Sequence, residues 1–459
     1  MTRLDRMIRR ASVLWRRSGQ RRLEAPLAVL RRRAATAAGA LLLALAALAF
    51  ARTGDFAQRS FALLYARHPW LPLVATPLVF AIVAGATRRW FPEAAGSGIP
   101  QAIAASRAPA AAATGPLVSL KTAIAKLSAT VLILFVGGSA GREGPTVQTS
   151  AAIMVSVHKL LRVPITAGVI IAGGAAGVAA AFNTPLAGVA FAIEELAAAY
   201  EQRVAVLVMG AVMISGLTSL GLAGDYVYFG VLRESLDVGS VLILAPVAGL
   251  AGGALGGLFS KTVLAFAASP RLAVVRRCRV RTALACGAVV ALAGFATHGA
   301  TWGTGYAATR ALIEQQGQPL WFGPAKFVAT LATTLSGTPG GIFAPSLSVG
   351  AGFGNLLSPL FPHEPTGAVV LLGMVAYFVG VVRAPLTAVI ILTETRANRG
   401  MILPLFATAL IADAASALVN RERLYHGLAR SFLPTRKAVH VDTRSYSAPP
   451  AATRPELRE

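Results

Sequence analysis

The sequence predicts an all-α, polytopic membrane protein built from two homologous halves. Apolar stretches recur along most of the 459 residues, charge is scarce, and three motifs return 200 positions later. Hydrophobic residues make up 55% of the chain and charged residues only 14%, against roughly a quarter in a typical globular protein. The mean hydropathy is +0.63. A soluble protein of this length would need more charged surface.

The apolar stretches give the expected membrane segments, and several are long enough to span a bilayer as a helix. The basic run before the first stretch is too long for a signal peptide, so we expect an uncleaved first membrane helix. The stretches are 34–50, 71–87, 127–136, 204–222, 241–266, 282–295 and 402–419.

The net charge of +24 lies mainly at the flanks of these stretches. Eleven arginines fall within residues 1–33, five more between Arg271 and Arg281, and others from Arg421 to Lys437. By the positive-inside rule, both termini and the central loop are expected to be cytoplasmic. The expected partner of this charge is anionic lipid, and nucleic acid is not an expected partner.

The cysteines and histidines give no sign of a metal site or a disulfide framework. Cys278 and Cys286 lie beside the basic central loop, and the six histidines are scattered without ligand spacing. We therefore expect no cofactor.

Three motifs of the first half return in the second half at the same offset, with shared Lys, Pro and Glu residues. Coincidence among Ala- and Gly-rich segments is the alternative, but one constant offset argues against it. The pairs are AKLSAT at 125–130 with AKFVAT at 325–330, GREGPTV at 141–147 with GIFAPSL at 341–347, and NTPLAGVAFAIEE at 183–195 with RAPLTAVIILTET at 383–395.

These matches divide the chain into a basic N-terminal segment, two repeats and a terminal segment. The expected ranges are 1–33, 34–223, 236–420 and 421–459. Duplicated halves with Gly- and Pro-interrupted segments are typical of transporters whose site lies near the bilayer midplane. Whether the halves are inverted depends on an odd number of spans in each, which the short, broken segments leave open.

Three stretches place glycines before a proline and an apolar run: GSGIP at 96–100, GREGP at 141–145 and GGIFAP at 340–345. Proline suits the first turn of a helix, so each stretch predicts a helix that starts inside the protein. Free N–H groups at such starts favour an anion. A Gly-Pro kink in an ordinary membrane helix is the alternative, notably for GSGIP alone. The motif residues are Gly96, Gly98, Pro100, Gly141, Gly144, Pro145, Gly341 and Pro345.

Acidic side chains inside the membrane are costly and are functional candidates. Glu143 stands at a predicted helix start, where its carboxylate could occupy the anion site and leave it when protonated. The alternative is a helix cap with Arg142 as its counter-ion. Glu194 and Glu195 end an apolar run, where a functional role and a snorkelling role near a membrane face are both open.

The quoted motifs, together with FNTPLAGVAFAIEE and VRAPLTAVII, resemble the signature segments of the CLC chloride channel and transporter family over residues 80–430. The resemblance implies two inverted-topology repeats of tilted, broken helices and a homodimer with one anion pathway in each subunit. Only 34 residues follow Tyr425, too few for the paired nucleotide-sensing domains of many eukaryotic relatives.

The resemblance also implies a role for each motif residue. Ser97, Tyr425 and the amides of Ile342 and Phe343 would bind chloride. Glu143 would be the gating glutamate that carries protons on the outer side. Glu195 would be the inner proton-transfer glutamate, with Glu194 helping protons to reach it.

The function expected is proton-coupled chloride antiport, and a passive chloride channel of the same fold is the alternative. Glu195 favours the antiporter, because channels of the family usually lack an acid there. An intramembrane enzyme would need a nucleophile–base pair or a metal motif, and neither HExxH nor a GxSxG-like element is present. A membrane scaffold would leave the buried glutamate and the three helix starts unexplained.

Overall fold

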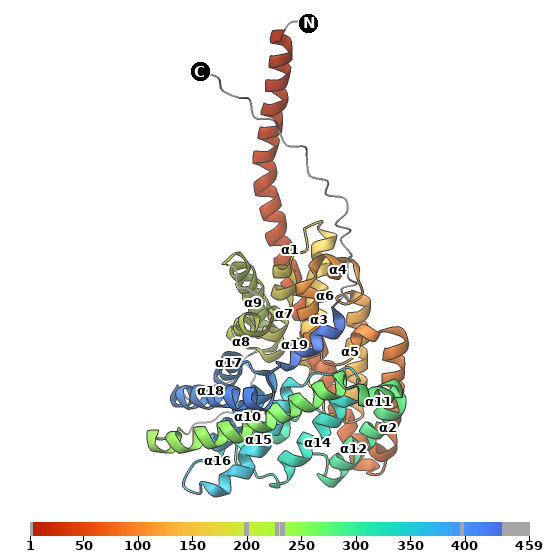
Figure 1. The fold of residues 1–459 in the computed structure, drawn as a ribbon, viewed down its shortest axis with the longest axis vertical. Coiled ribbons are helices and arrows are strands. Elements are labelled where there is room, and N and C mark those ends of the chain that lie inside the picture. Colours follow the sequence, from red (N-terminus) through yellow and green to blue (C-terminus); the bar gives the residue numbers. More distant parts are fainter. Residues whose placement is uncertain (1–2, 197–201, 225–228, 230–234, 395–398, 434–459) are drawn as a thin grey trace, which may run out of the picture.

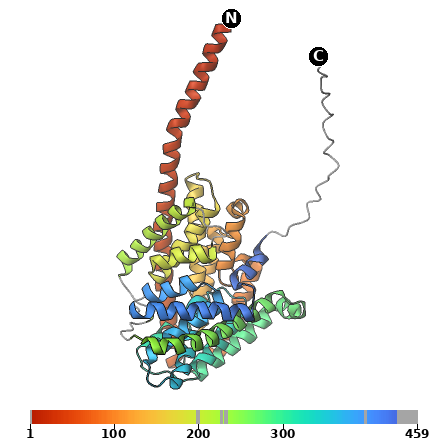
Figure 2. The ribbon, with the colours of Figure 1, turned by 60° about the vertical axis from the view of Figure 1, so that its left-hand side comes forward.

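The computed structural model describes residues 3–196, 202–224, 229, 235–394 and 399–433. Within these ranges the chain consists of helices and short connections, with one isolated bridge between two residues. Figures 1 and 2 show the helices packed into one body, from which the N-terminal part of α1 (Arg3–Arg67) extends. The all-α prediction is confirmed, and the basic segment and the first apolar stretch lie in one continuous helix.

The helices of the first half differ widely in length, as expected for segments interrupted by glycine and proline. A π-helical turn, Ala192–Leu196, directly continues α8. They are α2 (Leu71–Trp90), α3 (Ile99–Arg107), α4 (Pro109–Thr114), α5 (Leu120–Phe135), α6 (Glu143–Leu160), α7 (Ala167–Phe182), α8 (Pro185–Phe191) and α9 (Gln202–Ala223).

The second half shows the same mixture of long and short helices. They are α10 (Val238–Ala268), α11 (Ala273–Arg277), α12 (Arg279–Ala296), α13 (Tyr306–Ile313), α14 (Phe322–Leu335), α15 (Phe343–Leu357), α16 (Thr366–Val382), α17 (Pro385–Glu394), α18 (Ile402–Val419) and α19 (Leu424–Ala429).

Equivalent positions of the two halves have the same backbone conformation. Helices α6 and α15 begin 200 positions apart, as do α8 and α17. Helices α7 and α16 both end at a residue in the left-handed region, Asn183 with φ 58° and Arg383 with φ 63°. Because non-glycine residues seldom adopt positive φ, its recurrence at matching sites indicates a repeated chain path.

The two halves meet at equivalent residues. Gly141 N donates to Gly341 O at 2.7 Å, and Gly341 N donates to Gly141 O at 2.9 Å, forming an antiparallel bridge. Two equivalent residues that exchange hydrogen bonds in this way are related by a local two-fold axis, which passes between them. The inverted-topology repeats implied by the resemblance therefore have a direct contact at their centre, while the exact boundaries of the repeats stay a prediction.

The most deeply buried helices are the equivalent pair α7 and α16. Every residue of α16 after Thr366 is buried, and so is every residue of α7 after Ala167. A helix that is apolar on all sides belongs in the interior of a large protein. Helices α7 and α16 end just before the starts of α8 and α17. They therefore form the buried centre of the protein, next to the site.

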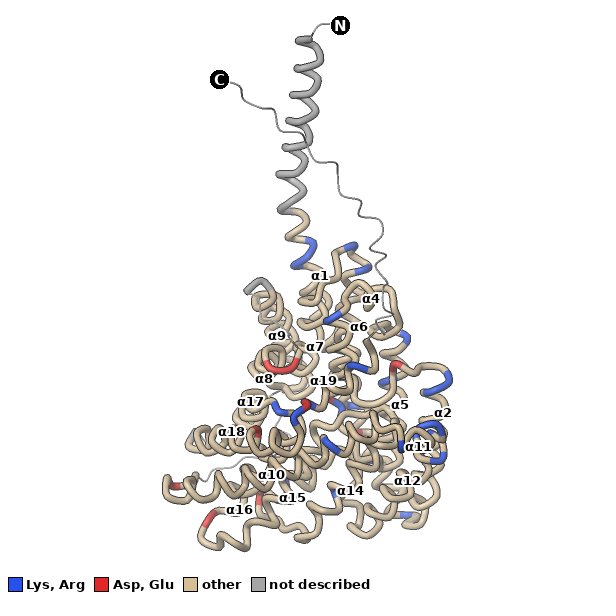
Figure 3. Tube along the Cα trace, viewed as in Figure 1, with Lys and Arg blue, Asp and Glu red and all other residues tan. Residues whose placement is uncertain are grey.

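The outer helices have the surface of a membrane protein. Among the described residues, six helices are long and apolar enough to cross a bilayer: the part Leu27–Arg67 of α1, and α2, α9 from Val204, α10, α12 and α18. Leucines on their outer faces are exposed, Leu418 by 88%. Figure 3 shows Lys and Arg gathered around α11, between two of these helices. The protein is a multi-pass membrane protein.

Candidate anion and proton site

The three predicted helix starts come together in the interior. A Cβ on Gly98 would lie 2.4 Å from Gly144 O, and a Cβ on Gly144 would lie 2.3 Å from Ser97 Oγ and 3.2 Å from Gly341 Cα. Real Cβ atoms are not found this close to other atoms, so only glycine allows the approach. Pro100, Pro145 and Pro345 each lie in the first turn of their helix, at the starts that the sequence predicts.

A cavity of about 320 Å³ borders this convergence. Gly96, Ser97, Ile342 and Tyr425 line it, together with part of the α14–α15 loop. The basic side chains on the lining are those of Arg276 and Arg279. The cavity therefore connects residues predicted to bind chloride with the basic loop predicted to be cytoplasmic.

Two hydroxyl groups at the cavity lack well-formed hydrogen bonds. Ser97 Oγ and Tyr425 Oη are buried and lie near each other, but neither makes a well-formed hydrogen bond among the described residues. Buried polar atoms are normally satisfied, and an exception points to a missing ligand or water. Ile342 caps the start of α15, and the Phe343 ring packs 6.0 Å from that of Tyr425, between centroids.

Glu143 lies fully buried in the interior, against the helix start of the other half. Its Oε2 lies 3.4 Å from Ala344 N, in the first turn of α15, a long hydrogen bond. A Cβ on Gly141 would lie 2.4 Å from the same oxygen. The Glu143 carboxylate thus occupies the end of a helix where the backbone favours an anion.

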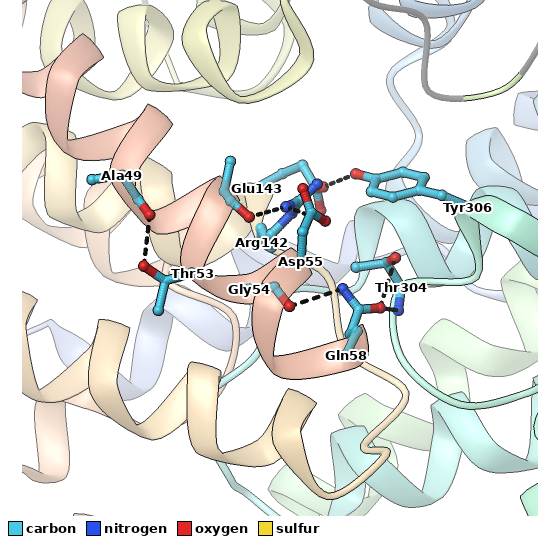
Figure 4. A network of polar contacts seen from close by, with 10 residues as sticks. Ala49, Thr53, Gly54, Asp55, Gln58, Arg142, Glu143, Thr304 and Tyr306 are labelled. Carbon is cyan, nitrogen blue, oxygen red and sulfur yellow. Dashed lines mark hydrogen bonds and ion pairs between the residues drawn. The ribbon is translucent and has the colours of Figure 1, made fainter. Parts of the chain in front are cut away.

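Tyr306, which the sequence analysis missed, donates a hydrogen bond from its hydroxyl to Glu143 Oε1 (Figure 4). It is the first residue of α13 and lies 163 positions from Glu143. No motif of the first half repeats around it. Its ring also packs against Phe229, at 5.3 Å between centroids. The carboxylate is therefore held from both sides, by α15 and by Tyr306.

Arg142, next to Glu143 in the sequence, forms its ion pair with α1. Its Nη1 lies 2.9 Å from Asp55 Oδ1, and it also donates to Ala51 O (Figure 4). The guanidinium lies 5.4 Å from the centroid of the Tyr306 ring, within cation–π distance. Arg142 thus links the start of α6 to α1. This role differs from the alternative considered from the sequence, in which Arg142 is the counter-ion of Glu143.

The matched lysines of the AKLSAT and AKFVAT motifs hold the loops that lead into the site. Lys126 Nζ donates to Gly96 O at 2.8 Å, in the loop that carries Ser97. Lys326 Nζ donates to Gly303 O at 2.9 Å, in the loop that precedes Tyr306. Both lysines are fully buried. The repeat therefore duplicates a support for the site as well as its helix starts.

Glu194 and its counterpart Glu394 cap helices of the opposite half. The Glu194 carboxylate accepts from the N–H groups of Leu386 and Thr387 at 2.8 and 2.7 Å, at the start of α17. The Glu394 carboxylate accepts from the N–H groups of Leu186 and Ala187, at 3.0 Å each, at the start of α8. This reciprocal capping is a structural role that the sequence match between Glu194 and Glu394 did not reveal.

Glu195 lies in different surroundings from Glu194, because successive side chains of a helix point in different directions. It is 1% exposed, and neither carboxylate oxygen has a hydrogen-bond partner among the described residues. A snorkelling role requires a side chain that reaches the surface, so that alternative does not fit Glu195. Its Oε1 lies 3.8 Å from Nδ1 of His426, the residue after Tyr425.

The comparisons with known proteins agree with this geometry. The model of the voltage gated chloride channel family matches residues 79–417. The chain belongs to this family. The resemblance stated from the motifs is thereby confirmed.

Curated relatives of the chain include "H(+)/Cl(-) exchange transporter ClcA" of Yersinia pestis bv. Antiqua (strain Angola) and of Yersinia pseudotuberculosis serotype O:3 (strain YPIII). The chain is 30% identical to each over 410 residues, which cover 83% of both chains.

Solved structures share the fold. A slow cyanobacterial Cl−/H+ antiporter has a TM-score of 0.73 at 24% identity, covering 88% of this chain and 99% of its own. A CLC-type fluoride/proton antiporter has a TM-score of 0.73 at 21% identity, covering 87% and 98%. At these identities the likeness shows the fold alone, and it confirms the predicted arrangement of broken helices in two inverted repeats.

Proposed function

We propose that the protein exchanges chloride for protons across the membrane. The observation that carries the proposal is the position of Glu143, whose carboxylate lies at the start of α15 where the backbone favours an anion. A side chain that competes with the transported anion for one site, and leaves it on protonation, couples the two ions. The printed names of the curated relatives, which are exchange transporters, support the same reaction.

Chloride would bind where the two buried hydroxyls face the helix start. Ser97 Oγ and Tyr425 Oη would donate to it, and the N–H groups of Ile342 and Phe343 would complete the site. None of these groups carries a full positive charge, so the ion is held by dipoles and can leave again. Arg276 and Arg279, on the lining of the cavity, would raise the local concentration of anions.

Protons would use two glutamates on opposite sides of the chloride site. Protonated Glu143 no longer competes for the start of α15, so it moves aside and chloride enters. Glu195 would exchange protons between Glu143 and the cytoplasm. Its burial keeps it away from bulk water, which prevents a continuous leak of protons.

The decisive experiment records chloride and proton movement together in proteoliposomes. A chloride gradient is expected to drive protons uphill in the opposite direction. Chloride flux with no proton movement against its gradient would instead indicate a passive channel. Nothing in the site resembles the machinery of an enzyme, and we propose transport as the sole activity.

We also propose a homodimer in a bacterial inner membrane, with both termini in the cytoplasm. The family resemblance supports the dimer, and the exposed apolar faces of α9, α10 and α18 offer surface for lipid or a second copy. The arginine distribution supports the orientation. Counting photobleaching steps of singly labelled subunits in liposomes tests the dimer: two steps are expected, and one step would contradict it.

Removing the Tyr306 hydroxyl is expected to weaken the binding of the Glu143 carboxylate at the anion site. In Tyr306→Phe, Glu143 loses one of its two hydrogen bonds and leaves the anion site more readily. A hydrogen bond to a charged group is worth about 1.5–3 kcal/mol, so chloride efflux from liposomes should rise about tenfold. Tyr65→Phe, which removes a hydroxyl from a tyrosine packed on Trp302, is the matched control. An unchanged efflux in Tyr306→Phe would contradict the role given to Tyr306.

A further inference from the structure

The two neighbouring glutamates Glu194 and Glu195 are not equally free to carry a proton. The Glu194 carboxylate accepts from two backbone N–H groups and from the hydroxyl of Thr387, at 2.6 Å. Three donors stabilise its charged form, because a carboxylate at a helix start is held by the amides and by the helix dipole. A proton placed on Glu194 would disrupt the start of α17. This glutamate is therefore poorly suited to pass protons on.

Glu195 needs a partner other than Glu194 to exchange protons, because its carboxylate is buried. Its two oxygens lack hydrogen bonds among the described residues, and its side chain is 0% exposed. His426 Nδ1 lies 3.8 Å from Glu195 Oε1. A small rotation of either side chain would close this distance to a hydrogen bond of about 2.7–3.0 Å.

His426 lies between this buried position and the surface of the protein. Its Nδ1 is buried without a hydrogen-bond partner, yet its side chain is 31% exposed, so another part of the same ring faces outward. An imidazole can accept a proton at one nitrogen and donate one from the other. The ring therefore lies between Glu195 and the surface of the protein.

Several charged groups face the imidazole. Arg107, at the end of α3, and Arg423 and Arg430, beside α19, add positive charge around it, and Glu195 faces it from the π-helical turn. Arg430 is itself paired with Glu422, at 2.9 Å. Arg107 and Arg423 also lie near Glu195, so the ring and the carboxylate share one positively charged environment.

We propose that His426 relays protons between the aqueous phase and Glu195, and that Glu194 instead serves as a helix cap. The inference rests on the proposed antiport. In the inward step of the relay the ring takes a proton from water at its exposed side and gives the Nδ1 proton to a Glu195 oxygen. No other bond forms or breaks. His426 thereby takes over the role that the family resemblance gave to Glu194.

The test compares coupled fluxes of single variants in proteoliposomes. His426→Gln is expected to lower the number of protons moved per chloride by at least about tenfold, somewhat less than the roughly 100-fold at the lower end of what a positioned acid–base group contributes. His363→Gln, at an exposed histidine elsewhere, and Glu194→Gln, which still offers an oxygen to α17, are expected to keep the wild-type ratio.

A second measurement separates a relay from a structural role. Imidazole added to His426→Ala is expected to restore proton flux, because a free base can enter the space left by the ring. Loss of both fluxes in parallel, at an unchanged ratio and without rescue, would overturn the relay. So would a ratio that falls in Glu194→Gln but not in His426→Gln. A wild-type protein without coupling would instead refute the antiport itself.

Discussion

Glu143→Ala is expected to abolish proton coupling while chloride flux persists. The alanine removes the carboxylate that we propose competes with chloride at the start of α15, so the anion site would stay available at all times. It also removes the group that carries a proton through the same place. In proteoliposomes, proton movement driven by a chloride gradient should fall by about 100-fold or more, a loss in the range of a removed acid–base group.

The control for this variant is Glu314→Ala, which removes an exposed carboxylate beyond the end of α13. It is expected to match the wild type in both fluxes. If Glu143→Ala kept its proton coupling, the carboxylate would not be the shared element of the two pathways, and the proposed mechanism would be wrong.

Glu195→Gln is expected to have the second-largest effect, with uncoupled chloride transport as the result. Glutamine has nearly the same size and shape, so the packing around the π-helical turn should be kept, but the amide cannot carry a proton between His426 and Glu143. Proton flux should fall to the background of empty liposomes. Chloride flux should stay near that of the wild type, since Glu195 does not line the cavity beside Ser97.

The outcome that contradicts this role is specific. Proton flux that survives in Glu195→Gln would show that protons reach Glu143 by another path. A parallel loss of both fluxes with a lower melting temperature would show that the buried carboxylate supports the fold. Glu314→Gln, measured alongside, controls for the loss of one acidic group.

The sequence predicted the helix starts because their causes are local. Glycine before proline, followed by an apolar run, determines where a helix can begin, and α3, α6 and α15 begin within these motifs. The repeat added what local patterns cannot show, namely that GREGP and GIFAP are equivalent. The proposed chloride and gate residues could be named at this stage, and the structure places them around one convergence of helices.

Other parts of the site depend on contacts between distant segments, which no local pattern encodes. Asp55 meets Arg142 across 87 positions, and Tyr306 meets Glu143 across 163. The sequence did record the match between Glu194 and Glu394, but not that each carboxylate caps the other half. His426 passed unnoticed because a single histidine has no ligand spacing, and its meaning comes only from the neighbouring Glu195.

The bridge between Gly141 and Gly341 limits how this transporter can change shape. In many transporters with inverted repeats, one repeat rocks against the other to expose the site alternately to each side. Here such a swing would pull apart two backbone hydrogen bonds of 2.7 and 2.9 Å directly beside the gate. We therefore expect a spectroscopic distance between labels on α6 and α15 to stay constant during turnover, and a change of several ångströms would contradict this. Movements of individual side chains would then open the site to one side of the membrane at a time, while the backbone stays in place.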